Sequence, residues 1–235
     1  MDARPSPDAE GQGPGGAPVV MLHGLGRTPR SLRRLEHALA QAGFRPLNWG
    51  YPSRRHRLAR HVAWLRDRLD DLTDAGPVHF VGHSLGALLI RGALSRPLPI
   101  AVGRVVMIAP PNRGAGVAER HAGSRLARWV FGEPLRDFDD AGAAFERLGV
   151  PAAEVGVIAG SRRFHPLNPI SYVNAWRRPD GGHDGTVEVE RTKLPGMTDF
   201  LVVPAHHTFI CDHPVVVEGT VAFLRDGRFA ATPAA

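Results

Sequence analysis

Apolar residues in this chain gather in short runs that alternate with longer amphipathic segments. From Pro18 onward the order is "PVVMLHG", a helical pattern over 31–42, "FRPLNWGY", a helical pattern over 58–72, and "PVHFVGHS". Short apolar runs are typical of buried strands, whereas apolar positions that repeat every third or fourth residue are typical of helices. This part of the chain therefore predicts the order strand, helix, strand, helix, strand.

The same alternation continues toward the C-terminus. A helix from about Leu85 to Ser95 is followed by a strand "GRVVMIAPP", an irregular stretch over 112–152 and a strand "AEVGVIAG". A long loop, a strand "DFLVVPA" and a last helix from about Pro214 to Arg225 complete the pattern. Continuous apolar strands separated by helices predict an α/β fold, with a mostly parallel central sheet and helices on both faces.

The length of 235 residues fits one domain of this class. We expect a flexible leader over 1–17, a single α/β domain over 18–230 with a short cap at about 113–152, and a tail over 231–235. The leader contains G-x-G-x-x-G, a pattern of dinucleotide sites, but here it precedes a strand and includes Pro14. Since the nucleotide fingerprint must follow a strand and open a helix, we expect no nucleotide and no other cofactor.

Charge changes this interpretation little. The formal net charge is +6, almost all from arginine, and basic residues gather in "SRRHRLARH" and near Arg34. An anionic surface or a nucleic acid could bind such segments, but no pattern of stacking aromatic residues accompanies them. We therefore interpret them as the solvated faces of two helices and expect no nucleic-acid partner. The oligomeric state is open.

Cysteine use and hydropathy bear on location. Cys211 is the single cysteine, which excludes an intrachain disulfide, and its apolar neighbours predict a core position. The first 16 residues lack the continuous apolar region of a signal peptide, and no later run is long enough to span a membrane. We expect a cytoplasmic protein without an integral membrane segment.

Metal-binding patterns are weak. The chain has no H-E-x-x-H and no spacing typical of a calcium loop, and "DFDD" at 137–140 is interpreted as the solvated start of a helix. We expect no metal.

The segment "VHFVGHSLGALLI" at 78–90 carries the strongest chemical signal. Ser84 stands where the apolar run changes from strand to helix, with Gly82 and Gly86 two residues to either side. A strained backbone at the serine would bring both positions against neighbouring backbone, which only glycine permits. This G-x-S-x-G pattern predicts a nucleophile elbow with Ser84 as nucleophile.

An acyl-transfer reaction also needs donors for the oxyanion. The Leu85 N–H follows the nucleophile directly, and the Leu25 N–H lies among glycines in "HGLG" after the first strand, so we expect these two groups to form the oxyanion hole. His23 and His83 are interpreted as scaffolding that holds the loops through hydrogen bonds.

A serine hydroxyl needs a base, and the base needs an acid that orients it. Asp184 in "HDGTV" and the histidine pair in "HHTFI" follow Ser84 in the order serine, acid, histidine. The competing acids are Asp180, Glu188 and Asp212. Of these, Asp180 lies in a Gly-rich run, and Glu188 lies in a predicted extended segment, where we expect its side chain to be solvated.

These motifs together resemble the α/β-hydrolase superfamily, in particular small serine esterases and bacterial lipases with little or no lid. The resemblance covers Pro18 to Phe229 and rests on "HGLG", "GHSLG", "APPNRG", "HDGTV" and "HHTFI". It implies Ser84 as nucleophile, Asp184 as acid, His207 as base, and Leu25 and Leu85 as oxyanion donors. His207 is preferred over His206 because it directly precedes the Thr-Phe pair of the family pattern.

The resulting hypothesis is a serine hydrolase that cleaves carboxylic esters of small molecules or lipids through an acyl-enzyme. Two alternatives stay open: an acyltransferase with the same three residues, and a non-catalytic protein of this fold that binds an apolar ligand. The complete set of residues favours catalysis, but it does not separate hydrolysis from transfer.

Overall fold

The computed structural model describes residues 16–114, 132–138, 145, 148–164 and 182–229. Most of the leader predicted over 1–17, much of the cap predicted over 113–152 and the predicted tail lie outside the described residues. Asp180 does so as well.

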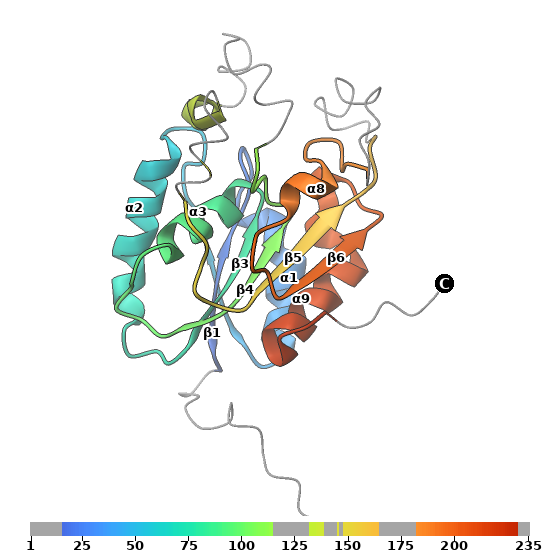
Figure 1. The fold of residues 1–235 in the computed structure, drawn as a ribbon. Helices are drawn as coiled ribbons and strands as arrows, with labels where there is room; N and C mark the ends of the chain where they lie inside the picture. The colour runs from blue at the N-terminus through green and yellow to red at the C-terminus, as the bar shows by residue number, and fades with distance from the viewer. Residues whose placement is uncertain (1–15, 115–131, 139–144, 146–147, 165–181, 230–235) are drawn as a thin grey trace, which may run out of the picture.

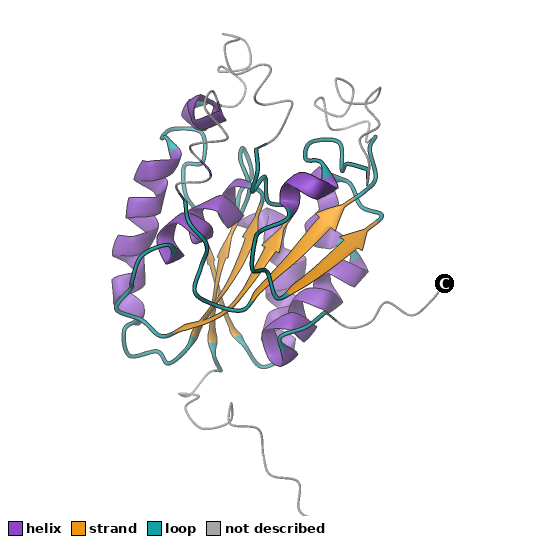
Figure 2. Cartoon of the chain, viewed as in Figure 1, coloured by secondary structure: helices purple, strands orange, loops and turns teal. Residues whose placement is uncertain are grey.

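The core of the molecule is a six-stranded sheet in the order β2-β1-β3-β4-β5-β6, and every neighbouring pair is parallel. Figures 1 and 2 show its twist. The strands are β1 (Pro18–Leu22), β2 (Arg45–Trp49), β3 (Val78–His83), β4 (Val102–Ile108), β5 (Val155–Gly160) and β6 (Asp199–Val203). The parallel sheet confirms the predicted fold class.

Helices connect most of these strands. They are α1 (Arg33–Gln41), α2 (Leu58–Leu69), α3 (Leu85–Leu94), α8 (Val189–Thr192) and α9 (Pro214–Asp226). Short 3-10 segments cover Pro29–Leu32, Asp70–Leu72, Glu133–Phe138 and His207–Asp212. In the part of the chain described, no helix is long and apolar enough to cross a membrane.

Helix α8 was not predicted, because its segment was expected to be extended. The backbone of Glu188 is extended, but Val189–Thr192 form one helical turn. Val189 and Thr192 are buried, and a single turn offers too few positions for the helical period to appear in the sequence.

The sheet is covered on both faces, as the strand pattern requires. Along β1, Val19 and Met21 pack into one apolar cluster with residues of α1 and α9, whereas Val20 and Leu22 pack into another with residues of α2 and α3. This alternation follows from the two-residue period of a strand. Figure 1 shows the two helical layers on either side of the sheet.

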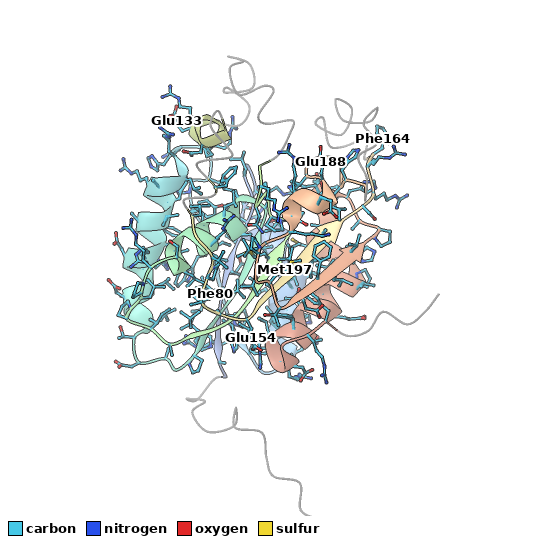
Figure 3. All side chains as sticks on the ribbon, in the orientation of Figure 1. Phe80, Glu133, Glu154, Phe164, Glu188 and Met197 are labelled. Carbon is cyan, nitrogen blue, oxygen red and sulfur yellow. The ribbon has the colours of Figure 1, made fainter. Side chains whose placement is uncertain are left out.

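Since all six strands run in one direction, their carboxyl ends meet at one edge of the sheet. We call this the carboxyl edge, and the opposite side, where the strands begin, the amino edge. In Figure 3 Glu133, Glu188 and Phe164 mark the carboxyl edge, and Glu154 marks the amino edge. In open α/β sheets the reacting groups gather at the carboxyl edge.

Candidate active site

Ser84 occupies a sharp turn between β3 and α3. Its φ of 52° and ψ of −116° lie in a region that non-glycine residues rarely adopt. The Ser84 N–H donates to the Ile108 carbonyl at the end of β4, at 2.9 Å, which anchors the turn to the neighbouring strand. The strained backbone presents the serine hydroxyl at the carboxyl edge.

The two glycines of the motif are needed because the backbone packs closely around this turn. A Cβ added to Gly82 would lie 2.6 Å from the backbone of Ala87. A Cβ added to Gly86 would meet the Leu22 carbonyl oxygen and lie 2.7 Å from the His23 carbonyl oxygen. The glycines therefore let α3 lie directly against β3 and the end of β1.

A continuous chain of hydrogen bonds joins Ser84, His207 and Asp184. The Ser84 Oγ lies 3.0 Å from His207 Nε2, and His207 Nδ1 lies 2.7 Å from Asp184 Oδ2. The Asp184 side chain is fully buried, and that of His207 is 11% exposed. With Nδ1–H donating to the carboxylate, Nε2 is left to accept the serine proton.

The position of Asp184 is set by its own backbone neighbours. Its Oδ1 accepts hydrogen bonds from the N–H groups of Thr186 at 2.9 Å and Val187 at 2.7 Å, and its carbonyl accepts the His207 N–H at 3.0 Å. A Cβ on Gly160 would lie 2.8 Å from the Asp184 Cβ, so this glycine lets the loop approach the end of β5. The carboxylate is therefore aimed at His207 with little freedom.

The competing candidates lie elsewhere. The His206 Nδ1 is 2.9 Å from the Arg162 carbonyl, so its ring is directed away from the serine. Glu188 is half-buried and forms an ion pair with Arg191 at 3.2 Å, whereas a solvated side chain was expected. Asp212 is exposed.

The two expected oxyanion donors follow the ends of neighbouring strands, β1 and β3. Leu85 is the first residue of α3, and Leu25 lies in the turn after β1. Among the described residues, neither backbone N–H donates to a protein acceptor. The loop of Leu25 passes close to the serine, since a Cβ added to Gly24 would lie 3.3 Å from the Ser84 Cβ.

His83 holds the loop of His207. Its Nε2 lies 3.1 Å from the His207 carbonyl oxygen, which can only accept, so Nε2 carries the proton. The two rings lie 5.0 Å apart. Burial, followed by the charges of His207 and Arg27, holds the pKa of His83 well below its usual value, so the ring is neutral. The sequence predicted a scaffolding role for His83, but not this partner.

The loop that carries Leu25 is held from several directions. The His23 ring stacks on Tyr51 with a centroid distance of 4.5 Å, and the Tyr51 hydroxyl donates to the His23 carbonyl at 2.7 Å. The Gly26 N–H donates to Ser53 Oγ at 3.0 Å, and an Arg27 guanidinium N–H donates to the Thr208 carbonyl at 3.3 Å. Sequence reasoning missed Ser53 and Arg27, because these contacts join residues far apart in the chain.

Other polar candidates serve the fold. Asp137 accepts from the Leu58 N–H at 2.8 Å and pairs with Arg57 at 3.0 Å, so it tethers the start of α2 instead of beginning a solvated helix. Cys211 is buried, as predicted, and burial raises the pKa of its thiol. Within the described ranges, no group of three or more His, Cys, Asp or Glu side chains could hold a metal ion.

Comparison with solved structures finds the same fold in lipases and esterases. The lipase BlEst2 of Bacillus licheniformis, in its propeptide form, matches with a TM-score of 0.72 and 19% identity over 96% of this chain and 54% of that one. The chain thus spans about half the length of that form, but 91% of the mature form, at a TM-score of 0.68 and 16% identity. A metagenomic carboxyl esterase matches with a TM-score of 0.65 and 20% identity, over 88% of this chain and 70% of that one.

Sequence comparison is more decisive for the family. No curated protein sequence matches the chain. A model of the alpha/beta hydrolase family matches residues 19–229, which cover nearly the whole described domain. The chain therefore belongs to the alpha/beta hydrolase family.

Proposed function

We propose that the protein is a serine hydrolase that cleaves carboxylic esters through an acyl-enzyme intermediate. Ser84 is the nucleophile, His207 the general base and Asp184 the acid that orients it. The backbone N–H groups of Leu25 and Leu85 stabilise the oxyanion. No cofactor or metal takes part in this proposal.

The proposed reaction has two halves. His207 Nε2 takes the Ser84 proton as Oγ attacks the ester carbonyl, and the same proton then passes to the departing alkoxide, so that an alcohol leaves. Water next attacks the acyl-enzyme and gives its proton to His207. The carboxylic acid leaves, and the proton returns to Ser84. In both halves the negative charge on the former carbonyl oxygen develops toward the Leu25 and Leu85 N–H groups.

The unbroken hydrogen-bonded chain from Asp184 through His207 to Ser84 is the observation that supports this proposal most strongly. An apolar ligand site would not need a buried carboxylate, an imidazole and a strained serine in line. The lipases and esterases among the structural neighbours support a hydrolase in general, and they are the reason that carboxylic esters are chosen as the substrates in this proposal.

The sharpest test is a panel of 4-nitrophenyl esters of increasing acyl length, assayed beside the matching 4-nitroanilides. We expect turnover of the esters and little of the amides, whose leaving group is poorer. Because the predicted cap is short, we expect turnover of soluble short-chain esters below their solubility limit. Transfer of the acyl group to added alcohols at the expense of hydrolysis would favour the acyltransferase. No turnover, with intact folding, would favour the binding protein.

A further inference from the structure

Among its described residues, the carboxyl edge carries more positive charge than its own ion pairs neutralise. Most of its described carboxylates already have a cationic partner, in the pairs Glu133–Arg136, Asp137–Arg57, Glu188–Arg191 and Glu190–Lys193. Asp184 bonds to His207. Among the described residues of these loops, Asp212 is the remaining acid.

Several arginines of the same edge have no carboxylate partner in the described part of the chain. They lie in the loops after β1, β2, β4 and β5, and we call them the rim arginines: Arg27, Arg30, Arg55, Arg113, Arg162 and Arg163. Because the strands are parallel, these loops surround the end of β3 that carries Ser84. The loops that carry the rim arginines therefore lie on both sides of the candidate active site at the same edge of the sheet.

Two of the rim arginines contact the loop of the proposed base. An Arg27 guanidinium N–H donates to the Thr208 carbonyl at 3.3 Å, next to His207. The Arg162 N–H donates to the Ala205 carbonyl at 3.2 Å. The positive charge of Arg27 also contributes to the lowered pKa of His83, directly before the nucleophile. Of these two contacts, that of Arg27 involves the charged group, so the Arg27 guanidinium lies beside the loop of the proposed base.

The amino edge differs in charge. Three acidic residues follow α2 at this edge, namely Asp70, Asp71 and Asp74. Their negative charges offset those of exposed arginines such as Arg96 and Arg228. Arg104 lies near the start of β4, and its guanidinium forms an ion pair with Glu154 at 2.6 Å. Among the described residues, the excess positive charge is therefore concentrated at the edge that holds Ser84.

We propose that the ester substrate carries a negatively charged group, a carboxylate or a phosphate, which the rim arginines attract and orient. This inference rests on the proposed ester hydrolysis. Cationic side chains around an active site raise the local concentration of an anionic substrate and the rate of its association. The anionic group belongs either to a small soluble ester or to an ester lipid in an anionic surface, and both present the same chemistry.

Two aryl esters of equal acyl length test the proposal: 4-nitrophenyl hexanoate, which is neutral, and the mono-4-nitrophenyl ester of adipic acid, which ends in a carboxylate. At low ionic strength we expect kcat/KM for the adipate ester to exceed that for the hexanoate by about tenfold or more. The ratio should fall toward one as sodium chloride is added, because salt screens exposed charges beyond about 10 Å at 0.1 M.

Variants of matched charge locate the effect. The double variant Arg113→Gln/Arg162→Gln removes two exposed charges at the carboxyl edge, and Arg96→Gln/Arg228→Gln removes two at the amino edge. The hydrogen bonds of Arg113 to Arg191 and of Arg162 to Ala205 involve the backbone atoms of Arg113 and Arg162, so the first variant should fold. We expect the adipate-to-hexanoate ratio to fall about threefold or more in the first variant and to stay within about twofold of wild type in the second.

A second experiment with lipids distinguishes a small soluble anionic ester from an anionic ester lipid. Hydrolysis of phosphatidylglycerol and of phosphatidylcholine is compared in vesicles of each lipid. Preference for the adipate ester identifies a small anionic ester. Preference for phosphatidylglycerol without preference for adipate identifies an anionic lipid. The inference would be overturned if the neutral and anionic substrates were hydrolysed at equal rates both as aryl esters and as lipids. It would also be overturned if the adipate-to-hexanoate ratio fell equally in the two double variants. Either result would leave ester hydrolysis intact. If no ester is hydrolysed, the proposed function itself fails.

Discussion

The two sides of the candidate site are built in different ways. On the nucleophile side, Ser84 is held by close steric packing, where Gly82 and Gly86 admit neighbouring backbone that any side chain would exclude. On the base side, His207 is held by hydrogen bonds from segments far away in the sequence, including Asp184 and His83. The first side tolerates almost no change in shape, whereas the second tolerates changes that keep the right donors and acceptors.

The largest expected effect is the loss of turnover when the proposed base itself is removed. His207→Ala should reduce ester turnover by about 10⁴-fold, because no other described side chain is hydrogen-bonded to the Ser84 hydroxyl. His206→Ala is the matched control, since its ring is directed to the Arg162 carbonyl, and it should keep most of the activity. Steady-state kinetics of both purified, folded variants decides this, and the reverse pattern would transfer the base to His206.

The next effect is a loss of stability when a methyl group is added on the nucleophile side. Gly86→Ala places a methyl group against the Leu22 carbonyl oxygen and should destabilise the fold by about 3 kcal/mol, at the upper end for overpacking. Gly26→Ala is the control, because its φ is +67° but no atom lies within 4 Å of the added Cβ, so it should cost about 1 kcal/mol. Urea denaturation measures both, and equal losses would contradict the steric account of the elbow.

The difference between the two sides also explains what the sequence predicted. The strands, their order along the chain and the elbow follow from local patterns of apolar residues and glycine. The contacts between His83 and the His207 carbonyl and between Ser53 and Gly26 could not be predicted, because they depend on which loops meet at the carboxyl edge. Helix α8 was missed because one turn shows no period. The roles of Asp184 and His207 as acid and base stay predictions until kinetics tests them.

A smaller effect on kcat tests whether the hydrogen bond from His83 positions the proposed base. His83→Phe keeps an aromatic ring but loses the donor to the His207 carbonyl, and we expect a loss of about tenfold in kcat with little change in KM, typical of a lost hydrogen bond. His83→Gln retains an N–H donor and should recover part of the loss. If Phe and Gln variants behave alike, with unchanged pH profiles, the hydrogen bond does not position the base.

The smallest effect is a dependence of stability on pH. Burial lowers the pKa of His61 to about 4 and that of His83 well below its usual value, so both rings are neutral in the fold. The unfolded chain takes up these protons below about pH 6.5, so stability should be complete above that pH and decline as the pH falls below it. Thermal denaturation at pH 7.5, 6.0 and 5.0 should show decreasing Tm, with a shallower decrease in His61→Gln. A Tm that rises toward pH 5.0 would contradict the buried neutral rings.

The central claim is that Ser84 is an activated nucleophile, and covalent labelling tests it most directly. A fluorophosphonate probe reacts quickly only with a serine that has a base in place and oxyanion donors beside it. Intact-mass measurement should show one phosphonyl group added to the wild-type protein, which is the mass of the probe less that of HF. The folded Ser84→Ala variant should show no added mass. An unmodified wild-type protein, or a Ser84→Ala variant that still takes up the probe, would contradict the account.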